Sequence, residues 1–195
     1  VAERIALFRI PLKDSFRRAV GLPRAAWGMA VAHAAVGVMV LGITASTAWR
    51  VELIQHMKPG ESLTVAGYTV TFASAGPMTG PNYRGVQGQF VITRDGDHVT
   101  TLRPEKRIYP AEGNNTTEAG IHTTAGGDLY VVLGDESGQG GWSTRVYFNP
   151  LVAWIWIGAV LMAVGGMISL SDRRLRVGAP KRAAPKPKNM QGETA

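Results

Sequence analysis

The stretch AAWGMAVAHAAVGVMVLGITASTAW, residues 25–49, decides the fold of this chain. It contains no Asp, Glu, Lys or Arg and is bounded by Arg24 and Arg50. An apolar run of about 20 residues is long enough to cross the hydrocarbon core of a bilayer as an α-helix. The pattern therefore predicts a first transmembrane helix over residues 25–49.

A second uncharged run covers residues 146–171, between Arg145 and Asp172, and includes LVAWIWIGAVLMAVGGMISL. By the same argument on length it predicts a second transmembrane helix. Residues 50–145 between the two runs are polar. We therefore expect an integral membrane protein fragment, with two transmembrane α-helices that flank a small extracytoplasmic domain.

The basic residues are concentrated at the two ends of the chain. Of the formal net charge of +7, residues 1–24 contribute +4, residues 50–145 contribute −2 and residues 172–195 contribute +5. Lys and Arg next to a spanning helix are retained on the cytoplasmic side. Both termini are therefore predicted in the cytoplasm and the middle domain outside it. Because the basic residues flank membrane helices rather than a folded surface, we expect no nucleic acid partner.

The composition excludes several kinds of site. The chain has no Cys, which removes disulfides, zinc-thiolate sites and thiol catalysis. It begins with Val1, and no cleavable signal pattern precedes the first predicted span. We interpret the chain as a fragment, or as the C-terminal piece of a larger multispanning protein.

The end segments carry two further expectations. Residues 1–24 form a basic connector in which Ile5, Phe8, Leu12 and Phe16 follow helical spacing. This pattern is typical of an amphipathic segment on the anionic inner leaflet, and a solvated cytoplasmic connector is the alternative. The tail, residues 172–195, is rich in Pro, Lys and Ala, so we expect it to be disordered.

The middle domain, residues 50–145, shows short alternating patterns that are typical of β-strands. Residues 62–73 read as two strands around Gly67, and Asp95-Gly96-Asp97 predicts a hairpin between residues 89–94 and 98–102. Further strands are expected at residues 107–110, 121–124, 129–133 and 143–148, separated by the Gly- and Asn-rich residues 113–117 and 134–141. Short strands separated by turn signals predict a small antiparallel all-β sandwich or barrel.

His33 is the one titratable residue inside the first predicted span, residues 25–49. An ionisable side chain in the hydrocarbon indicates a functional site by default. Met29, Ala30, Val36 and Gly37 share its helical face, and most of them are small or flexible. Two readings stay open from spacing alone: His33 donates a hydrogen bond to a neighbouring helix, or it ligates a metal or haem.

The other histidines, His56, His98 and His122, lie in the middle domain and do not cluster. Structural roles are expected for His98 and His122, whereas His56 follows the first span closely enough to approach a site at the outer interface. A zinc centre needs several converging ligands. No nucleophile, base and orienting acid can be paired, and no nucleotide-binding glycine pattern is present. We therefore assign no catalytic residue.

One dense polar run, RPEKRIYP, covers residues 103–110. Arg103, Lys106 and Arg107 beside Tyr109 could hold a partner or propionate groups through charge-assisted hydrogen bonds. The alternative is a solvated strand edge that its charges protect from pairing.

Several motifs together resemble the C-terminal part of the cytochrome c maturation protein F family, the membrane haem lyase. They are WGMAVAH (residues 27–33), PNYRGVQGQF (81–90), PEKRIYP (104–110), TEAGI (117–121), DLYVVLGD (128–135) and WIWIGAVLMAVGGMISLSDRR (154–174). The resemblance covers nearly the whole chain except the tail.

The resemblance implies a multi-pass protein of the bacterial inner membrane, with a periplasmic middle domain, that helps attach haem covalently to apocytochrome c. It implies that His33 is an axial ligand of the iron of a transmembrane b-type haem (haem b). The second ligand and the tryptophan-rich haem-handling segment lie upstream in the family, so this chain is not catalytically complete alone. The implied partners are haem, apocytochrome c and other maturation subunits, including the haem chaperone. The alternative is a non-catalytic module whose membrane-anchored β-domain docks assembly partners.

Overall fold

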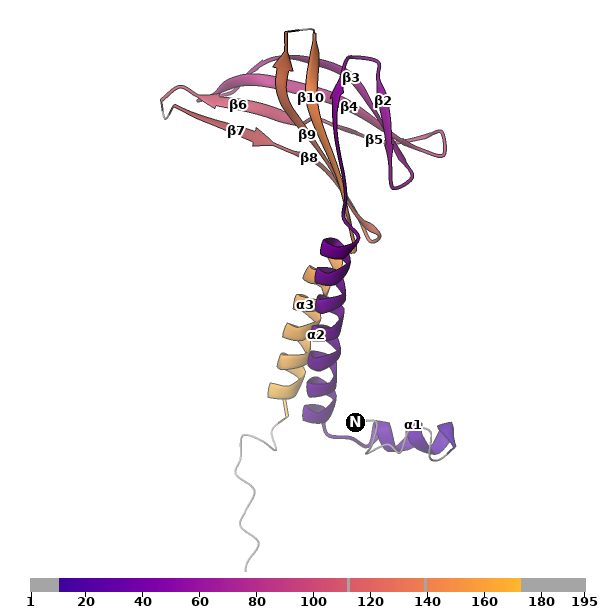
Figure 1. The fold of residues 1–195 in the computed structure, drawn as a ribbon. Helices are drawn as coiled ribbons and strands as arrows, with labels where there is room; N and C mark the ends of the chain where they lie inside the picture. The colour runs from indigo at the N-terminus through magenta and orange to yellow at the C-terminus, as the bar shows by residue number, and fades with distance from the viewer. Residues whose placement is uncertain (1–10, 112, 139, 173–195) are drawn as a thin grey trace, which may run out of the picture. The chain divides into compact units, whose positions relative to one another are not determined.

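The computed structural model describes residues 11–111, 113–138 and 140–172. The helices within these ranges are α1 (Leu12–Val20), α2 (Arg24–Ala48) and α3 (Ala153–Leu170). The strands are β1 (Val51–Met57), β2 (Ser62–Val65), β3 (Tyr68–Thr79), β4 (Arg84–Arg94), β5 (Asp97–Leu102), β6 (Glu105–Tyr109), β7 (Asn114–Glu118), β8 (Gly120–Thr124), β9 (Gly127–Ser137) and β10 (Gly141–Pro150). Two apolar helices flank an antiparallel all-β domain, which confirms the predicted fold class (Figure 1).

Both α2 and α3 are long and apolar enough to span a membrane, with mean hydropathies of 1.8 and 1.9. The chain divides into two compact units. One contains α1, the start of α2 and the end of α3. The other contains the remainder of α2 and α3 together with the β-domain, and it holds every β-strand within the described ranges.

In the first unit, two hydrogen bonds hold the start of α2. The Trp27 indole Nε1–H donates to the Ala19 carbonyl of α1 over 3.0 Å, and the Ala25 backbone N–H donates to Asp172 Oδ2 over 3.1 Å. The first amides of a helix have no partner within the helix, and a carboxylate there also complements the helix dipole. Asp172, just beyond α3, thus satisfies part of the N-terminus of α2.

Helix α1 begins directly after Pro11, a position at which proline does not disturb a helix. Phe16 and Val20 are 72% and 70% exposed on it. The part of the amphipathic expectation that concerns Ile5 and Phe8, and the expected disorder of the tail, lie outside the described residues.

The β-domain is a sandwich of two antiparallel sheets (Figure 1). One sheet has the order β1-β10-β9-β8. The other has the order β2-β3-β4-β6-β7, and β5 pairs with the remaining half of the long strand β4. The turns that join β2 to β3 and β4 to β5 have positive φ at both central residues, Ala66-Gly67 and Asp95-Gly96, as two-residue hairpins of type I′ require. The hairpin predicted at Asp95-Gly96 is therefore confirmed.

Alternating side chains from both sheets form the core. On β3 the buried apolar residues are Tyr68, Val70 and Phe72, and on β9 the large buried apolar residues are Leu129, Val131 and Leu133. Phe72 lies opposite Phe90 of β4, and the two rings stack with centroids 4.8 Å apart. A period of two is what places one face of each strand in the core.

Two strands are present where the sequence indicated none. Strand β1 (VELIQHM) is an edge strand with only Leu53 and Met57 turned toward the core. Strand β7 (NNTTE) is an edge strand with every residue exposed, in a stretch expected to be a separator. Neither sequence alternates in polarity, so the period-two signal is absent although the backbone pairs.

Helix α3 begins at Ala153, whereas the uncharged run that predicted it begins at residue 146. Val146 and Phe148 belong to β10, where their side chains pack in the β-domain core. The chain turns out of the strand at Leu151, which has a positive φ of 53° and donates its N–H to the Gly126 carbonyl. The apolar run therefore serves two elements, a strand and then a helix.

Candidate functional site

Glycines set the packing of α2 against α3 within the larger unit. A Cβ atom at Gly158 of α3 would lie 2.8 Å from the Met39 backbone nitrogen and 2.9 Å from the Ala35 carbonyl of α2. A Cβ atom at Gly42 would lie 2.9 Å from the Ile155 nitrogen. Small residues at such positions allow two helix backbones to approach closely. These contacts fix which face of α2 is turned toward α3.

His33 lies on a different face of α2. Its side chain is exposed, as are Val36 at 41% and Val40 at 51%, whereas Ala35 on the packed face is 2% exposed. Nothing lies within 4 Å of the position that a Cβ atom on Gly37 would occupy. Gly37 is one helical turn from His33, so it leaves open space beside the imidazole.

This arrangement fits an axial haem ligand. An imidazole nitrogen can ligate haem iron, and the helix surface at Gly37, one turn away, is uncovered. Among the described residues no three His, Asp or Glu side chains converge as a metal site would require. Within the described residues, His33 would therefore contribute a single ligand to any metal centre.

The three histidines of the β-domain make local contacts. His56 Nε2 lies 2.7 Å from Ser137 Oγ, near the end of β1 distant from α2, and His98 Nε2 lies 3.2 Å from Thr101 Oγ1. The His122 ring packs edge-on against Tyr68, with centroids 6.1 Å apart.

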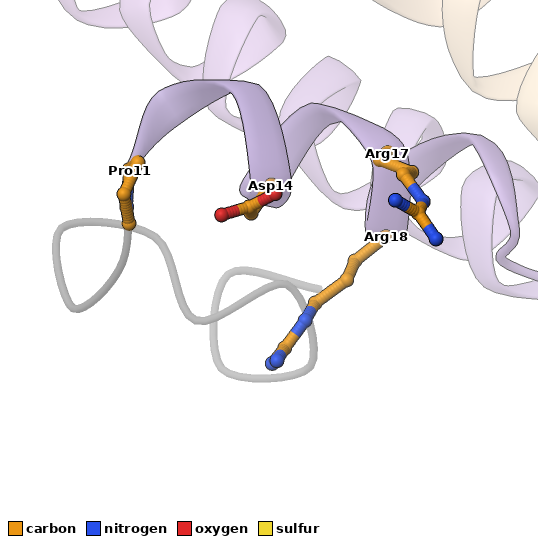
Figure 2. Close-up of a pocket in the computed structure, with 4 residues that line it drawn as sticks. All are labelled: Pro11, Asp14, Arg17 and Arg18. Carbon is orange, nitrogen blue, oxygen red and sulfur yellow. The ribbon is translucent and has the colours of Figure 1, made fainter.

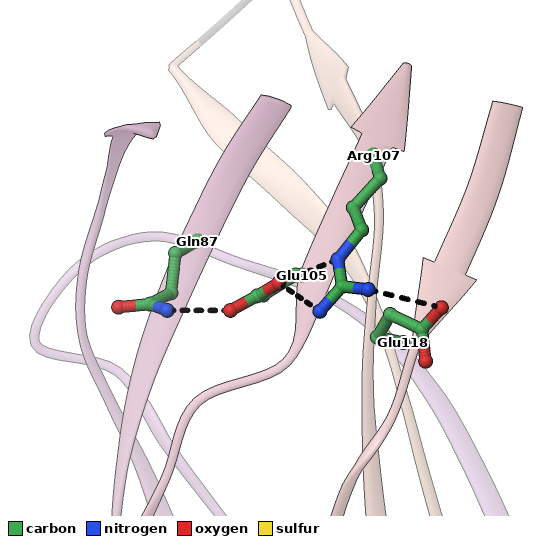
Figure 3. A network of polar contacts seen from close by, with 4 residues as sticks. All are labelled: Gln87, Glu105, Arg107 and Glu118. Carbon is green, nitrogen blue, oxygen red and sulfur yellow. Dashed lines mark hydrogen bonds and ion pairs between the residues drawn. The ribbon is translucent and has the colours of Figure 1, made fainter. Parts of the chain in front are cut away.

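Strand β6 carries an ion network on one of its faces (Figure 3). The Arg107 guanidinium donates to Glu105 over 2.7 Å and lies 3.6 Å from Glu118, while the Gln87 amide donates to the other oxygen of Glu105. The Arg107 guanidinium also stands 4.5 Å from the Tyr83 ring centroid. Burial acts to raise the pKa of Glu105, but the hydrogen bonds from Arg107 and Gln87 and the Arg107 charge together lower it. The network ties three strands together.

The three cations that the sequence analysis grouped, Arg103, Lys106 and Arg107, do not lie together in the structure. Arg107 is engaged by the two glutamates, and Lys106 pairs with Asp135 of β9 from the opposite face of β6. Arg103 is exposed just before β6. The structure therefore does not bring the three cations to one anion, because alternate residues of a strand point to opposite faces.

Asp128, at the start of β9, is a buried carboxyl that the sequence did not single out. It is 8% exposed, and no described residue donates a hydrogen bond to its Oδ1. Burial raises the pKa of Asp128, while a hydrogen bond from Thr123 and the proximity of His122 act to lower it. A buried carboxylate with an unsatisfied oxygen destabilises the folded state when it is ionised.

Asp128→Asn is expected to stabilise the β-domain at neutral pH. A folded-state pKa raised above the ordinary 3.8 means that the Asp128 contribution is fully present below that value and is lost as the pH rises through the folded pKa. Removing the charge should increase the free energy of unfolding at pH 7 by on the order of 1 kcal/mol, the typical cost of a buried polar atom without a hydrogen-bond partner, and should flatten its pH dependence above pH 4. Denaturant unfolding of the detergent-solubilised chain at several pH values measures both, with exposed Asp97→Asn as the control. A loss of stability at pH 7 would contradict the expectation.

A hollow beside α1 is lined by Pro11, Asp14, Arg17 and Arg18. Figure 2 shows the Arg18 side chain extending away from the helix, with Asp14 one turn earlier. The described lining carries charges of both signs on a helix with exposed apolar residues, which is compatible with the polar border of a membrane.

The comparisons with known proteins agree on one family. A family model described as the CcmF C-terminal beta-sandwich matches residues 48–150. The cytochrome c-type biogenesis protein CycK of Bradyrhizobium diazoefficiens is 47% identical over 186 residues, which cover 95% of this chain and 28% of that protein. The cytochrome c-type biogenesis protein CcmF of Escherichia coli is 41% identical over 160 residues, which cover 82% of this chain and 25% of that protein.

A solved structure, described as cytochrome c heme lyase CcmF, superposes with a TM-score of 0.61 at 25% sequence identity. The match covers 87% of this chain and 27% of the solved chain. This chain thus spans about a quarter of the length of these relatives. It belongs to the CcmF family of cytochrome c-type biogenesis proteins, as the C-terminal β-sandwich with the two apolar helices that flank it.

Proposed function

We propose that this chain is the C-terminal part of a cytochrome c haem lyase, which takes part in attaching haem covalently to apocytochrome c. In this proposal His33 supplies one axial ligand of a transmembrane b-type haem. The remainder of the lyase supplies the second ligand and the haem-handling segment. The chain's own contribution is to hold one imidazole at a fixed depth and orientation, and to present the β-domain.

The observation that carries the proposal is that His33 lies on a different face of α2 from the one that packs against α3. Glycine contacts turn one side of α2 to α3, and the exposed His33 lies on another side, with open space at Gly37. A titratable side chain within an apolar span marks a functional site by default. When bound, such a haem would supply one-electron redox chemistry, and His33 is the residue of this chain that would hold it.

The proposed location is the bacterial inner membrane, with both ends of the chain in the cytoplasm and the β-domain in the periplasm. The support is the excess of Lys and Arg at both ends of the chain and the net negative β-domain. Apocytochrome c and the other maturation subunits, including the haem chaperone, are the proposed partners on the β-domain side.

Single cysteines test this topology directly, because the chain contains no native Cys. A Cys at Thr116, on the exposed strand β7, is expected to react with a membrane-impermeant maleimide in cells whose outer membrane alone is opened. A Cys at Lys13 of α1 should react only after the inner membrane is permeabilised. The reverse labelling pattern would refute the topology.

His33→Ala in the intact lyase tests the ligand assignment. Loss of the His33 imidazole should strongly reduce the b-type haem absorption bands of the purified protein, because the haem would lose its iron–protein bond to this chain. His98→Ala is the matched control, since His98 is exposed in the hairpin between β4 and β5. Wild-type absorption bands in the His33→Ala protein would show that His33 is not a ligand.

A non-catalytic docking module remains the second candidate, because the β-domain has its own closed core of buried residues from both sheets. Under that function, His33→Ala would leave both the pigment and the yield of cytochrome c unchanged. The haem absorption measurement therefore separates the two candidates.

A further inference from the structure

A hollow of about 300 Å³ lies where strands β6 and β7 of one sheet meet the outer face of β9 and β10 of the other. Thr144 and Val146 of β10 are buried, so Ser143, Arg145 and Tyr147 alternate with them on the outer face. These three side chains form the floor together with Val132 and Gly134 of β9. Lys106 and Thr117, which are register partners on β6 and β7, form the wall.

Gly134 keeps this hollow open. A Cβ atom at Gly134 would lie 2.8 Å from the Ser143 carbonyl oxygen and 3.2 Å from the Ser143 Cβ. A side chain there would push β9 away from β10 or fill the floor. The concavity is therefore a consequence of the sequence at this position.

The hollow carries two cations and one anion. Lys106 has 25% of its side chain exposed and pairs with Asp135, which is 87% exposed. An ion pair with a solvated partner is weak, so a second carboxylate can compete for the ammonium group. Arg145 is exposed, and no described residue engages its guanidinium. The net charge of the lining is thus +1, which matches a singly charged anion better than a doubly charged phosphate.

The ion network on the other face of β6 holds this arrangement in place. Glu105 and Arg107 point away from the hollow and connect β6 to Gln87 of β4 and Glu118 of β7 (Figure 3). Since alternate residues of a strand face opposite ways, fixing Glu105 and Arg107 on one face orients Lys106 on the other. Strand β6 is therefore anchored on one side and presents a cation on the other.

We propose that this hollow is a carboxylate-binding site, in which Arg145 receives the carboxylate through its two parallel N–H groups and Lys106 supplies the second positive charge. The hydroxyl groups of Ser143, Thr117 and Tyr147 line the same hollow and can donate to a carboxylate oxygen. The carboxylate is either a porphyrin propionate or an acidic side chain of a polypeptide. The site does not involve His33.

The test uses the detergent-solubilised chain with ¹⁵N-labelled arginine, and the probe is sodium propionate titrated against sodium chloride at constant ionic strength. The Arg145 Nε–H resonance should shift with propionate and not with chloride. Arg145→Gln and Lys106→Gln should each weaken propionate binding about tenfold, the effect of losing one charge-assisted interaction. Lys58→Gln, which removes the same charge from an exposed turn of the β-domain, should change it less than about twofold.

Two further probe pairs identify the source of the carboxylate. Mesoporphyrin is compared with its dimethyl ester, and an acetylated Gly-Glu-Gly amide is compared with the Gly-Gln-Gly peptide. Preference for the free acid in the first pair assigns a propionate, and preference for glutamate in the second assigns an acidic side chain. The proposal is overturned if neither probe pair shows a preference and if chloride shifts the Arg145 Nε–H resonance as much as propionate does.

Arg145→Lys keeps the proposal testable where Arg145→Gln fails to fold. It retains the charge and removes the fork of two N–H groups, so binding should lie between that of the wild type and Lys106→Gln. Wild-type affinity in both Arg145→Lys and Lys106→Gln would refute the site. Because His33→Ala should leave propionate binding unchanged, failure of this proposal is distinguishable from failure of the haem-ligand assignment.

Discussion

Phe72→Ala is expected to lower the free energy of unfolding of the β-domain by about 3–5 kcal/mol. Phe72 is fully buried, and its ring stacks on Phe90 of the neighbouring strand with an interplanar angle of 17°. The change removes the buried ring and leaves a cavity that the surrounding side chains can fill only in part. It also removes the aromatic contact with Phe90. Since small domains are stable by about 5–15 kcal/mol in total, the loss is a large fraction of the whole.

Denaturant unfolding of the detergent-solubilised chain, followed by near-ultraviolet circular dichroism, measures this effect. Phe16→Ala is the matched control, because Phe16 lies on α1 and is 72% exposed. The control should leave unfolding of the β-domain unchanged. A difference below about 1 kcal/mol between Phe72→Ala and the wild type would show that Phe72 is not central to the core.

Gly158→Leu is expected to separate α2 from α3. The first added carbon would already overlap the Met39 and Ala35 backbone, and backbone atoms cannot move aside as a flexible side chain can. Overpacking of this kind destabilises by about 1–3 kcal/mol even where some adjustment is possible. Under the proposed haem assignment, the same change in the intact protein should reduce b-type haem content, because α2 would lose the contacts that set the direction of His33.

Gly166→Leu is the matched control for this prediction. Gly166 lies on the same helix, and nothing stands within 4 Å of the position of its missing Cβ atom. Unfolding in a titration with sodium dodecyl sulfate, followed by far-ultraviolet circular dichroism, gives the stability difference, and the absorption spectrum gives the haem content. Equal behaviour of the two leucine variants would mean that close glycine packing does not hold the helix pair.

Local sequence signals predicted the parts of the fold that depend on nearby residues. The uncharged runs predicted two apolar helices, and Asp95-Gly96 predicted a hairpin because type I′ turns need positive φ at both positions. The edge strands β1 and β7 were missed because few residues of β1 and none of β7 are buried, so neither sequence sustains an alternating pattern. The start of α3 differed from the start of the apolar run because a buried strand and an apolar helix share the same composition.

The same distinction between local signals and tertiary contacts applies to the candidate sites. His33 was found from the sequence because it is the one titratable residue within the first span. Its position on α2 relative to α3 could not be predicted, because it depends on how glycines of both helices, such as Gly42 and Gly158, pack. Asp128 gave no signal, because its burial arises in the folded sandwich. The carboxylate hollow joins Lys106 to Arg145 across two sheets, and no periodicity within either strand could place them together.

The pairing of β1 with β10 has a consequence for how this part of the protein can be rearranged. Val51, just after α2, is the register partner of Phe148, shortly before α3. Antiparallel partners lie about 5 Å apart, so the chain leaves the helical hairpin and returns to it at almost the same point. The entry and exit of the sandwich are therefore close enough for a short linker to join α2 directly to α3.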